Sequence, residues 1–356
     1  MSDPRHDFLQ AIGATLNGDE CAFAHEPTDL RALDGTNVIV PLSHYGLLEV
    51  RGPDAEKFLQ GQITCSAAEV SPTLSAPGAY CTAKGRVVTS FQLLRPEPER
   101  FLLRMRRDLL DIAARTFGKY IVFSKAKLNN SEMLGIGFYG AQIPARLREL
   151  IGALPAQHNG TVSHGDGLLL QCDNAATQFE FWGPPAAVRV LWDQCAQHST
   201  AAGTRFWRWL NIRAGSAEVC AATSEVFLPH MLNYHVTGAI NFKKGCYTGQ
   251  EIVARTHYRG QVKRHLLRAA LYDTSFDIGS GAGAPLPAGA ELIDAGGKTL
   301  GNIVDCVAID TQTAELLAVG GSEALAATNV KLALDTTKPG SDGAELRPLE
   351  LPYAIP

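Results

Sequence analysis

The sequence predicts an α+β protein that ends in a small β-barrel, and two observations support this. Through residue 262, short apolar runs typical of strands alternate with segments of helical periodicity. From Lys263 onward the composition shifts towards Gly, Ala, Leu and Val, and short strand-like runs are separated by Gly, Pro and Asp turns. The chain has 356 residues, 46% of them hydrophobic, which is enough for two or three domains with sizeable cores.

The first third of the chain predicts one helix, a long connection and a group of strands. Asp3-Pro4 is a capping signal, and the apolar spacing that follows predicts a helix as far as Leu16. Residues 17–37 are predicted as an irregular connection. Runs at 38–42 and 47–50 predict two paired strands, and a helix is expected from Ala55 to Ile63 with Asp54 as its cap.

Residues 80–94 predict a β-hairpin, with strands at 80–83 and 87–94 joined by the turn Lys84-Gly85-Arg86. Lys84 and Arg86 are either exposed charges at the tip of this hairpin or ligand contacts. Further strands are predicted at 101–103, 121–123, 133–138, 168–172 and 178–182, and helices at 108–120, 144–152, 184–197 and 204–214. In the helix at 184–197, the spacing of Trp192 indicates a core residue rather than a cofactor stack.

The C-terminal part predicts four short strands of a barrel, at 266–272, 298–307, 315–319 and 330–334. The segment from Gly279 to Gly289 is expected to be a flexible loop. The domain organisation that follows is an N-terminal helix and connection (1–37), a central region of two subdomains split near 125–150 (38–262), and the barrel (263–356).

Composition excludes several classes of function. No apolar run approaches about 18 residues, so no membrane span is expected. The eight cysteines lie far apart in a chain without an export signal, which predicts reduced thiols in the cytoplasm. No Cys-x-x-Cys pair occurs, so no metal ligands are predicted. No phosphate-binding glycine loop occurs either, which leaves nicotinamide and ATP binding without support.

The most informative stretch is 241–255, where Cys246 lies between two glycines and follows two lysines. Ammonium groups near the sulphur would favour the thiolate and make Cys246 more nucleophilic; alternatively, Cys246 is a buried packing residue. The run 252–254 predicts the start of a strand. Residues 241–268 carry a net charge of +6 in a chain of −4, so the remainder carries −10. This basic island indicates a specific anionic ligand rather than nucleic acid, or else a strand edge protected by charge.

Residues 244–251, Lys-Gly-Cys-Tyr-Thr-Gly-Gln-Glu, resemble the diagnostic motif of the YgfZ family. These proteins are folate-binding relatives of the glycine-cleavage T-protein, an aminomethyltransferase, and are linked to iron–sulphur protein maintenance and tRNA modification. Residues 52–64 and 227–233 extend the resemblance. It implies a T-protein-like multi-domain fold with a central folate region and a C-terminal β-barrel, a tetrahydrofolate cofactor, and transient iron–sulphur client enzymes as partners, without direct nucleic-acid binding.

The resemblance also implies roles for individual residues. Glu251 could accept the adjacent N–H groups of a pterin, and Tyr247 or Tyr80 could cover the ring. The carboxylates of the glutamate tail of folate could pair with Arg255, Arg259, Lys263 or Arg264. Cys246 is predicted as the reactive thiol. The predicted cofactor-binding residues are Lys84, Arg86, Lys244, Tyr247, Gln250, Glu251 and Arg255.

The sequence departs from the T-protein at three places. The catalytic acid is absent at Thr89 and Ser90, Arg213 replaces a glutamate, and His230 replaces a glutamine. Three hypotheses remain open: a folate-dependent accessory protein for iron–sulphur enzymes that uses Cys246, a true aminomethyltransferase, and a folate-binding module without chemistry of its own. The absent acid and the presence of Cys246 favour the first.

Overall fold

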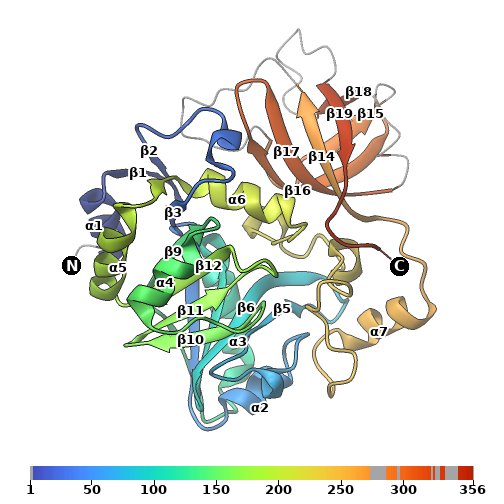
Figure 1. The fold of residues 1–356 in the computed structure, drawn as a ribbon. Helices are drawn as coiled ribbons and strands as arrows, with labels where there is room; N and C mark the ends of the chain where they lie inside the picture. The colour runs from blue at the N-terminus through green and yellow to red at the C-terminus, as the bar shows by residue number, and fades with distance from the viewer. Residues whose placement is uncertain are drawn as a thin grey trace.

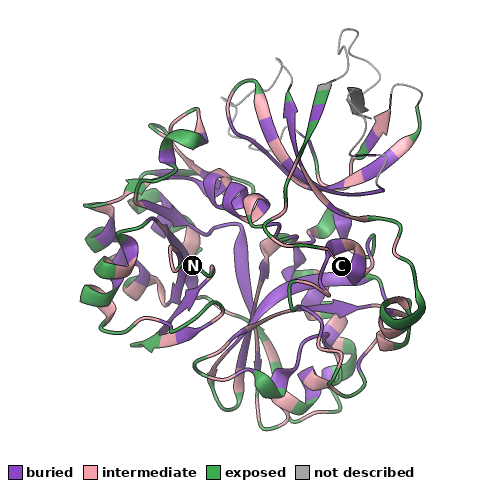
Figure 2. Cartoon of the chain, turned by 45° about the vertical axis from the view of Figure 1, so that its right-hand side comes forward, coloured by how far each residue is buried: buried purple, intermediate pink, exposed green. Residues whose placement is uncertain are grey.

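The structure is a computed structural model that describes residues 3–272, 286–294, 297–321, 324, 329–332 and 344–355. It is an α+β fold in which two sheets and their helices form the body and a barrel lies on top (Figure 1). Buried strands fill the centre of the body, and the exposed residues lie mainly on the outer helices and loops (Figure 2). The predicted fold class is therefore confirmed, including the C-terminal barrel.

The first sheet has five strands in the order β5-β6-β7-β4-β8 and contains the predicted hairpin. Its strands are β4 (Tyr45–Arg51), β5 (Ala76–Cys81), β6 (Val87–Glu97), β7 (Arg100–Arg106) and β8 (Lys127–Asn130). Helices α2 (Ala55–Gln60) and α3 (Leu110–Ile121) accompany it, and Phe117 of α3 packs edge-on against Tyr80 at 5.2 Å between ring centroids. The strand predicted at 121–123 is wrong. Ile121 is the buried last residue of α3, whereas Val122 and Phe123 lie exposed in the turn that follows, so the run does not form a strand.

The second sheet has six strands in the order β10-β11-β12-β9-β3-β13. They are β3 (Val38–Pro41), β9 (Leu134–Tyr139), β10 (Thr161–His164), β11 (Gly167–Gln171), β12 (Gln178–Gly183) and β13 (Thr200–Ala201), with helices α4 (Ile143–Ile151) and α5 (Pro185–Ala196). The predicted pairing of 38–42 with 47–50 is wrong, because β3 pairs with β9 and β13 whereas β4 pairs with β7 and β8. Two apolar strands close in sequence thus enter different sheets.

The N-terminal segment differs from its prediction. Helix α1 (Pro4–Ala11) is capped by Asp3 as expected, but it stops early and Leu16 belongs to strand β1 (Ala14–Asn17). The predicted connection at 17–37 contains β2 (Glu20–Phe23), which pairs with β1, and the short 3-10 helix η1 (Leu30–Leu33). Gly13 and Gly18 take positive φ and so permit the two tight turns that end α1 and join the strands. The core role of Trp192 is confirmed, since its ring packs against Phe8 and Phe23.

The barrel closes through the strand order β14-β17-β16-β15-β18-β19, with β19 pairing back onto β14. Its strands are β14 (His265–Tyr272), β15 (Glu291–Asp294), β16 (Thr299–Ala308), β17 (Thr313–Gly320), β18 (Asn329–Leu332) and β19 (Ala344–Leu349). Strands β15 and β19 had no prediction. Most of the predicted 279–289 loop, and residues 333–334 of a predicted strand, lie outside the described residues.

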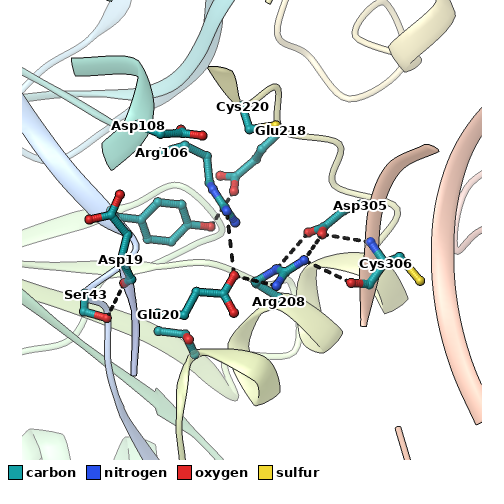
Figure 3. Close-up of polar contacts among 12 residues, drawn as sticks. Asp19, Glu20, Ser43, Arg106, Asp108, Arg208, Glu218, Cys220, Asp305 and Cys306 are labelled. Atoms are coloured by element: carbon teal, nitrogen blue, oxygen red, sulfur yellow. Dashed lines mark hydrogen bonds and ion pairs between the residues drawn. The ribbon is translucent and has the colours of Figure 1, made fainter. Parts of the chain in front are cut away.

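Helix α6 (Thr204–Arg213) joins the body to the barrel through one buried arginine (Figure 3). Arg208 Nη1 donates to Glu20 Oε1 of β2 at 2.5 Å, and its guanidinium also pairs with Asp305 of β16. Arg208 Nη2 donates a further bond to the Cys306 carbonyl at 3.0 Å. The buried guanidinium of Arg208 thus links α6 to β2 and to β16. Loss of either carboxylate partner would leave part of this buried charge unpaired, so the three elements are held in one arrangement.

Helix α7 (Gln250–Arg259) stands where the sequence predicted a strand at 252–254. The helix begins at Gly249, whose φ of +83° is a left-handed conformation that glycine adopts without strain. Glu251 in the first turn and Arg259 in the last turn suit the helix dipole, and Val253 is the buried residue of its inner face. Ile252 and Val253, the two β-branched residues of the predicted strand, therefore belong to an amphipathic helix.

Candidate functional site

The motif loop, residues 241–249, is fixed on the body of the protein by its own polar groups. The Asn241 amide N–H donates to the Thr64 carbonyl at 2.9 Å, and Asn241 Oδ1 accepts the amide N–H groups of Lys243 and Lys244. Lys244 Nζ donates to the carbonyls of Ile63 and Cys65, at 2.6 and 2.8 Å. Desolvation lowers the pKa of Lys244 to about 8. This lysine anchors the loop.

The loop also contacts the turn of the β5–β6 hairpin. A Cβ at Gly249 would lie 2.4 Å from the Thr82 carbonyl oxygen, and Gly85 lies against Ile252 of α7. Lys84 and Arg86, both exposed, therefore stand beside the start of α7, and the Arg86 guanidinium donates to the Val226 carbonyl. Segments that are distant in the sequence meet here.

Cys246 is exposed, unlike any of the other cysteines, and all eight lie within the described residues as free thiols. Burial raises the pKa of Cys21, Cys65 and Cys81 to about 12 and that of Cys195 to about 11. These buried thiols are poor nucleophiles because they deprotonate only at high pH. Solvent access alone therefore makes Cys246 the thiol most open to chemistry.

The remaining predicted residues divide between the surface and the interior. Glu251 and Arg255 are exposed on α7, and Gln250 is half-buried at its start. Tyr247 is buried, its ring centroid lies 5.2 Å from Lys244 Nζ, and desolvation raises the pKa of its hydroxyl. Tyr247 thus helps to fix the motif loop, because its ring is buried beside the Lys244 ammonium group.

A second polar region lies between the two sheets, in a cavity of about 660 Å³ that we call the central cavity. Its walls come from β6, β7, β11, β12, the end of α6, residues 214–218 and 234–239, and the C-terminal Pro352 and Tyr353. The Tyr353 hydroxyl donates to the Gly215 carbonyl at 2.8 Å and so fixes the C-terminal segment over the cavity. None of the eight predicted site residues lines it.

The buried end of the central cavity holds an ion network around Arg104. Its Nη1 lies 2.5 Å from Glu218 Oε1 and its Nε lies 3.4 Å from Glu180 Oε2. The guanidinium also stacks 4.2 Å from the ring centroid of Tyr45, whose hydroxyl donates to Glu218 Oε2 at 2.6 Å. Asn211 Nδ2 donates to the same hydroxyl at 2.8 Å. One cation thus holds two carboxylates in a site largely closed to water.

The two carboxylates differ in environment. Glu180 is almost fully buried and accepts a bond from Trp182 Nε1 at 2.8 Å; burial raises the pKa of Glu180 against the opposing effect of Arg104. The Glu218 side chain keeps 21% of its surface exposed. Each Glu218 oxygen already accepts one bond and has a lone pair left for a ligand N–H group.

A second cation of the central cavity wall, Arg213, is more exposed than Arg104. This side chain is 35% exposed and pairs with Asp34 at 3.0 Å, whereas that of Arg104 is 11% exposed. Phe91, Leu170 and Leu210 give the cavity apolar wall area. An acid in a buried ion network, apolar walls and a more exposed cation on the same cavity suit a flat heterocycle that carries an anionic tail, which is the form of a folate.

No prediction from the sequence covered Glu180 and Glu218, although a signal for Glu180 was present. Phe-Glu-Phe-Trp at 179–182 puts a charge inside an otherwise apolar strand, which is uncommon for a residue without a buried partner. Ser90, at the position of the absent acid, lines the cavity and accepts the Val219 amide N–H at 3.0 Å. It therefore helps to hold the segment that carries Glu218.

The motif loop and the central cavity share one wall. Gly78 lines the cavity, and a Cβ there would lie 2.5 Å from Cys65 Sγ, while the Cys65 carbonyl accepts Lys244 Nζ. Among the described residues, no group of three or more His, Cys, Asp or Glu side chains is arranged to hold a metal ion. No helix of the described chain has the length and apolarity to span a membrane.

Comparison with known proteins found no matching family model. The tRNA-modifying protein YgfZ of Escherichia coli O17:K52:H18 is 33% identical over 229 residues, which cover 64% of this chain and 70% of that protein. The protein of the same name from Shigella boydii serotype 18 matches to the same extent. Among solved structures, the glycine cleavage system aminomethyltransferase T from Bartonella henselae has a similar fold, with a TM-score of 0.71, 16% identity, and coverage of 96% of this chain and 94% of that one.

Proposed function

Because this chain belongs to the YgfZ family, we propose that it is a tetrahydrofolate-binding accessory protein linked to tRNA modification, which assists the assembly or repair of iron–sulphur enzymes. The relatives carry tRNA modification in their name. The cytoplasm is the proposed compartment, since all eight cysteines are free thiols, as expected in a reducing environment.

The central cavity is the observation that carries the folate proposal. The pterin ring would lie between the apolar walls, with its N–H groups donating to Glu218 and the bulk of the ring against Phe91 and Leu210. Arg213, the more exposed cation of the cavity wall, would pair with a carboxylate of the glutamate tail. When bound, tetrahydrofolate is a carrier of one-carbon units.

The residues of the motif loop are proposed to hold the Cys246 thiol in position on the surface. Lys244 and Tyr247 hold the loop, and Cys246 faces solvent where a client protein can reach it. A pterin in the central cavity and a thiol on the loop would be neighbours through Gly78 and Cys65. The surface around the start of α7, which a client or the folate tail would contact, is formed by Lys84, Arg86, Gln250, Glu251 and Arg255.

The folate proposal is tested by thermal unfolding with tetrahydrofolate under anaerobic conditions. A micromolar dissociation constant corresponds to about 8 kcal/mol of binding free energy and raises the unfolding temperature by mass action. Glu218→Gln keeps the shape of the side chain but removes the charge that pairs with Arg104, so the shift is measured from the variant's own unfolding temperature without ligand, and most of the shift should be lost. Glu149→Gln, on the exposed face of α4, is the matched control and should retain it. No shift in the wild-type protein at millimolar tetrahydrofolate would contradict the proposal.

An aminomethyltransferase is the second candidate, because the fold resembles that of the T-protein and the cavity contains acids. The catalytic acid position is occupied by Thr89 and Ser90, so we expect no ammonia release above background from a lipoyl-bound aminomethyl donor and tetrahydrofolate. Multiple turnovers in this assay, lost in Glu218→Gln, would favour the aminomethyltransferase instead.

A further inference from the structure

A groove of about 610 Å³ lies beside the C-terminal half of α7 and is separate from the central cavity. We call it the basic groove; none of its lining residues lines the central cavity. Helix α7 and the segment that leads from it to the barrel, which together supply most of the lining residues of the groove, lie at the outer edge of the molecule (Figures 1 and 2). The cationic residues of the groove are Arg255, Arg259, Lys263 and Arg264, and its apolar residues are Leu228, Met231 and Val262.

The four cations are available to a ligand. All are exposed, and within the described chain none takes part in an ion pair or a side-chain hydrogen bond. Elsewhere in the described chain some exposed arginines are paired, as Arg31 is with Asp29 and Arg51 with Glu97, and others stand singly on a helix surface, as Arg115 and Arg148 do on α3 and α4. Among the residues that the structure describes, no Asp or Glu lines the groove. In a chain of net charge −4, this is an unneutralised positive site.

Local structure does not account for these charges. A cation in the last turn of a helix stabilises the helix dipole, but that explains Arg259 alone. Protection of a strand edge does not apply to Arg255 and Arg259, because this segment is helical. The apolar residues of the groove, Leu228, Met231 and Val262, are only half-buried, whereas the cations are exposed. The groove therefore joins apolar surface to a positive rim.

We infer that the basic groove is a docking site for an acidic segment of a partner protein, with carboxylates meeting the rim and apolar side chains covering the floor. A free anion or an oligoglutamate tail would leave the floor exposed to water. Single-stranded RNA would be expected to use stacking rings, and no aromatic side chain of the described chain lines the groove. A mixed acidic and apolar peptide fits both chemistries.

Fluorescence anisotropy of a short labelled peptide that alternates Glu and Leu tests this assignment. We expect binding that weakens as salt rises, and a loss of about tenfold in Arg259→Glu/Arg264→Glu. The control Arg115→Glu/Arg148→Glu makes the same change in net charge at two exposed arginines of α3 and α4, and should bind as the wild type does. Both pairs lie on the surface, so circular dichroism should show all variants folded.

Three comparison probes decide the nature of the partner: oligoglutamate, a peptide that alternates Lys and Leu, and single-stranded RNA of the same length. The Glu–Leu peptide should bind more tightly than all three. Val262→Ser should weaken the binding of the Glu–Leu peptide severalfold and leave the binding of oligoglutamate unchanged, since this substitution removes apolar surface of the groove and no charge. The assignment is overturned if RNA or oligoglutamate binds as tightly as the peptide, or if the control variant loses as much affinity as the groove variant.

Discussion

In the motif loop the polar groups are consecutive in sequence and many face solvent, whereas those of the central cavity come from distant positions and are buried. Lys244, Cys246 and Glu251 lie within one short motif, but Arg104, Glu180 and Glu218 come from two sheets and a loop. A motif of consecutive residues therefore allows the surface that those residues form to be predicted from the sequence. It does not allow the neighbouring cavity to be predicted, because the cavity residues are distant in the sequence. The difference also implies that the two regions respond differently to substitution.

The energetic contrast follows from burial. A buried ion network depends on every partner, because an unpaired charge away from water costs several kcal/mol. An exposed loop exchanges its contacts with water at little cost. Substitutions in the central cavity should therefore change stability, and substitutions at the exposed thiol should change function without changing stability.

The largest expected effect is at Arg104. Arg104→Met keeps most of the side-chain volume but leaves Glu180 and Glu218 without their cation, so we expect a loss of about 3–5 kcal/mol in the free energy of unfolding. Urea unfolding measures it. Arg189→Ala, which breaks an exposed pair with Asp193, is the control and should cost less than about 1 kcal/mol.

A double variant tests the cause. If the loss arises from the unpaired carboxylates, Arg104→Met/Glu180→Gln should recover part of the stability that Arg104→Met loses. A double variant that is less stable by the full sum of both single losses would show that packing of the guanidinium against Tyr45 matters more than its charge.

The second prediction separates the two glycines of the motif loop. Gly249→Ala must hold a φ of +83° and place a methyl group 2.4 Å from the Thr82 carbonyl, so it should cost about 2 kcal/mol. Gly245 has no positive φ, and a Cβ there would meet no atom within 4 Å, so Gly245→Ala should change stability by less than about 0.5 kcal/mol. Urea unfolding of both variants makes the comparison, and equal losses would contradict this account of the turn.

The sequence predicted most elements of the fold because their patterns are local. The β5–β6 hairpin, the amphipathic helices and the succession of barrel strands each show a period or a turn signal within a few residues. The pairing of β3 and β4 could not be predicted in this way, because two apolar strands in sequence can enter either sheet. The apolar run in α7 was ambiguous for the same reason, and Gly249 decided it as a helix start.

In the candidate site, too, the local features could be predicted and the features formed by distant residues could not. The exposure of Cys246 contradicts the alternative in which this cysteine is a buried packing residue. The ion network was missed because Tyr45, Arg104, Glu180 and Glu218 come together only after two sheets have packed. No spacing in the sequence joins them. The motif loop could therefore be predicted from the sequence, whereas the central cavity became visible only in the structure.

The third prediction concerns His230, which is buried below α7 among three other histidines. Burial lowers its pKa to about 4, with His235, His257 and His265 acting in the same direction. The unfolded chain binds this proton near pH 6.5 and the folded chain does not, so stability is complete above pH 6.5 and falls as the pH decreases towards 4. We expect a loss on the order of 1 kcal/mol.

Replacement of this histidine by the amide of the related proteins isolates its contribution. His230→Gln should flatten the pH dependence of the urea midpoint between pH 6.5 and 4, with some slope left because burial also lowers the pKa of His235. His198→Gln, at an exposed position outside the cluster, should leave the slope unchanged. An unaltered slope in His230→Gln would mean that other groups take up the proton.

The smallest expected change in stability, and the largest contrast with function, is at Cys246. Cys246→Ser removes an exposed sulphur that packs against little, so the free energy of unfolding should change by less than about 0.5 kcal/mol. Alkylation at neutral pH, followed by mass spectrometry of peptides, should label Cys246 before the five buried cysteines. Cys172→Ser, a half-buried thiol lining the central cavity, is the matched control and should not slow the first labelling event.

The same variant decides whether the thiol has a chemical role. In a strain that lacks this protein, Cys246→Ser should fail to restore iron–sulphur enzyme activity although it is folded and binds tetrahydrofolate as the wild type does. Glu218→Gln should fail for the opposite reason, with an intact thiol and weakened folate binding. Full rescue by Cys246→Ser would leave folate binding in the central cavity as the whole function. Rescue by Glu218→Gln alone would instead make the motif loop sufficient, and the cavity a structural neighbour.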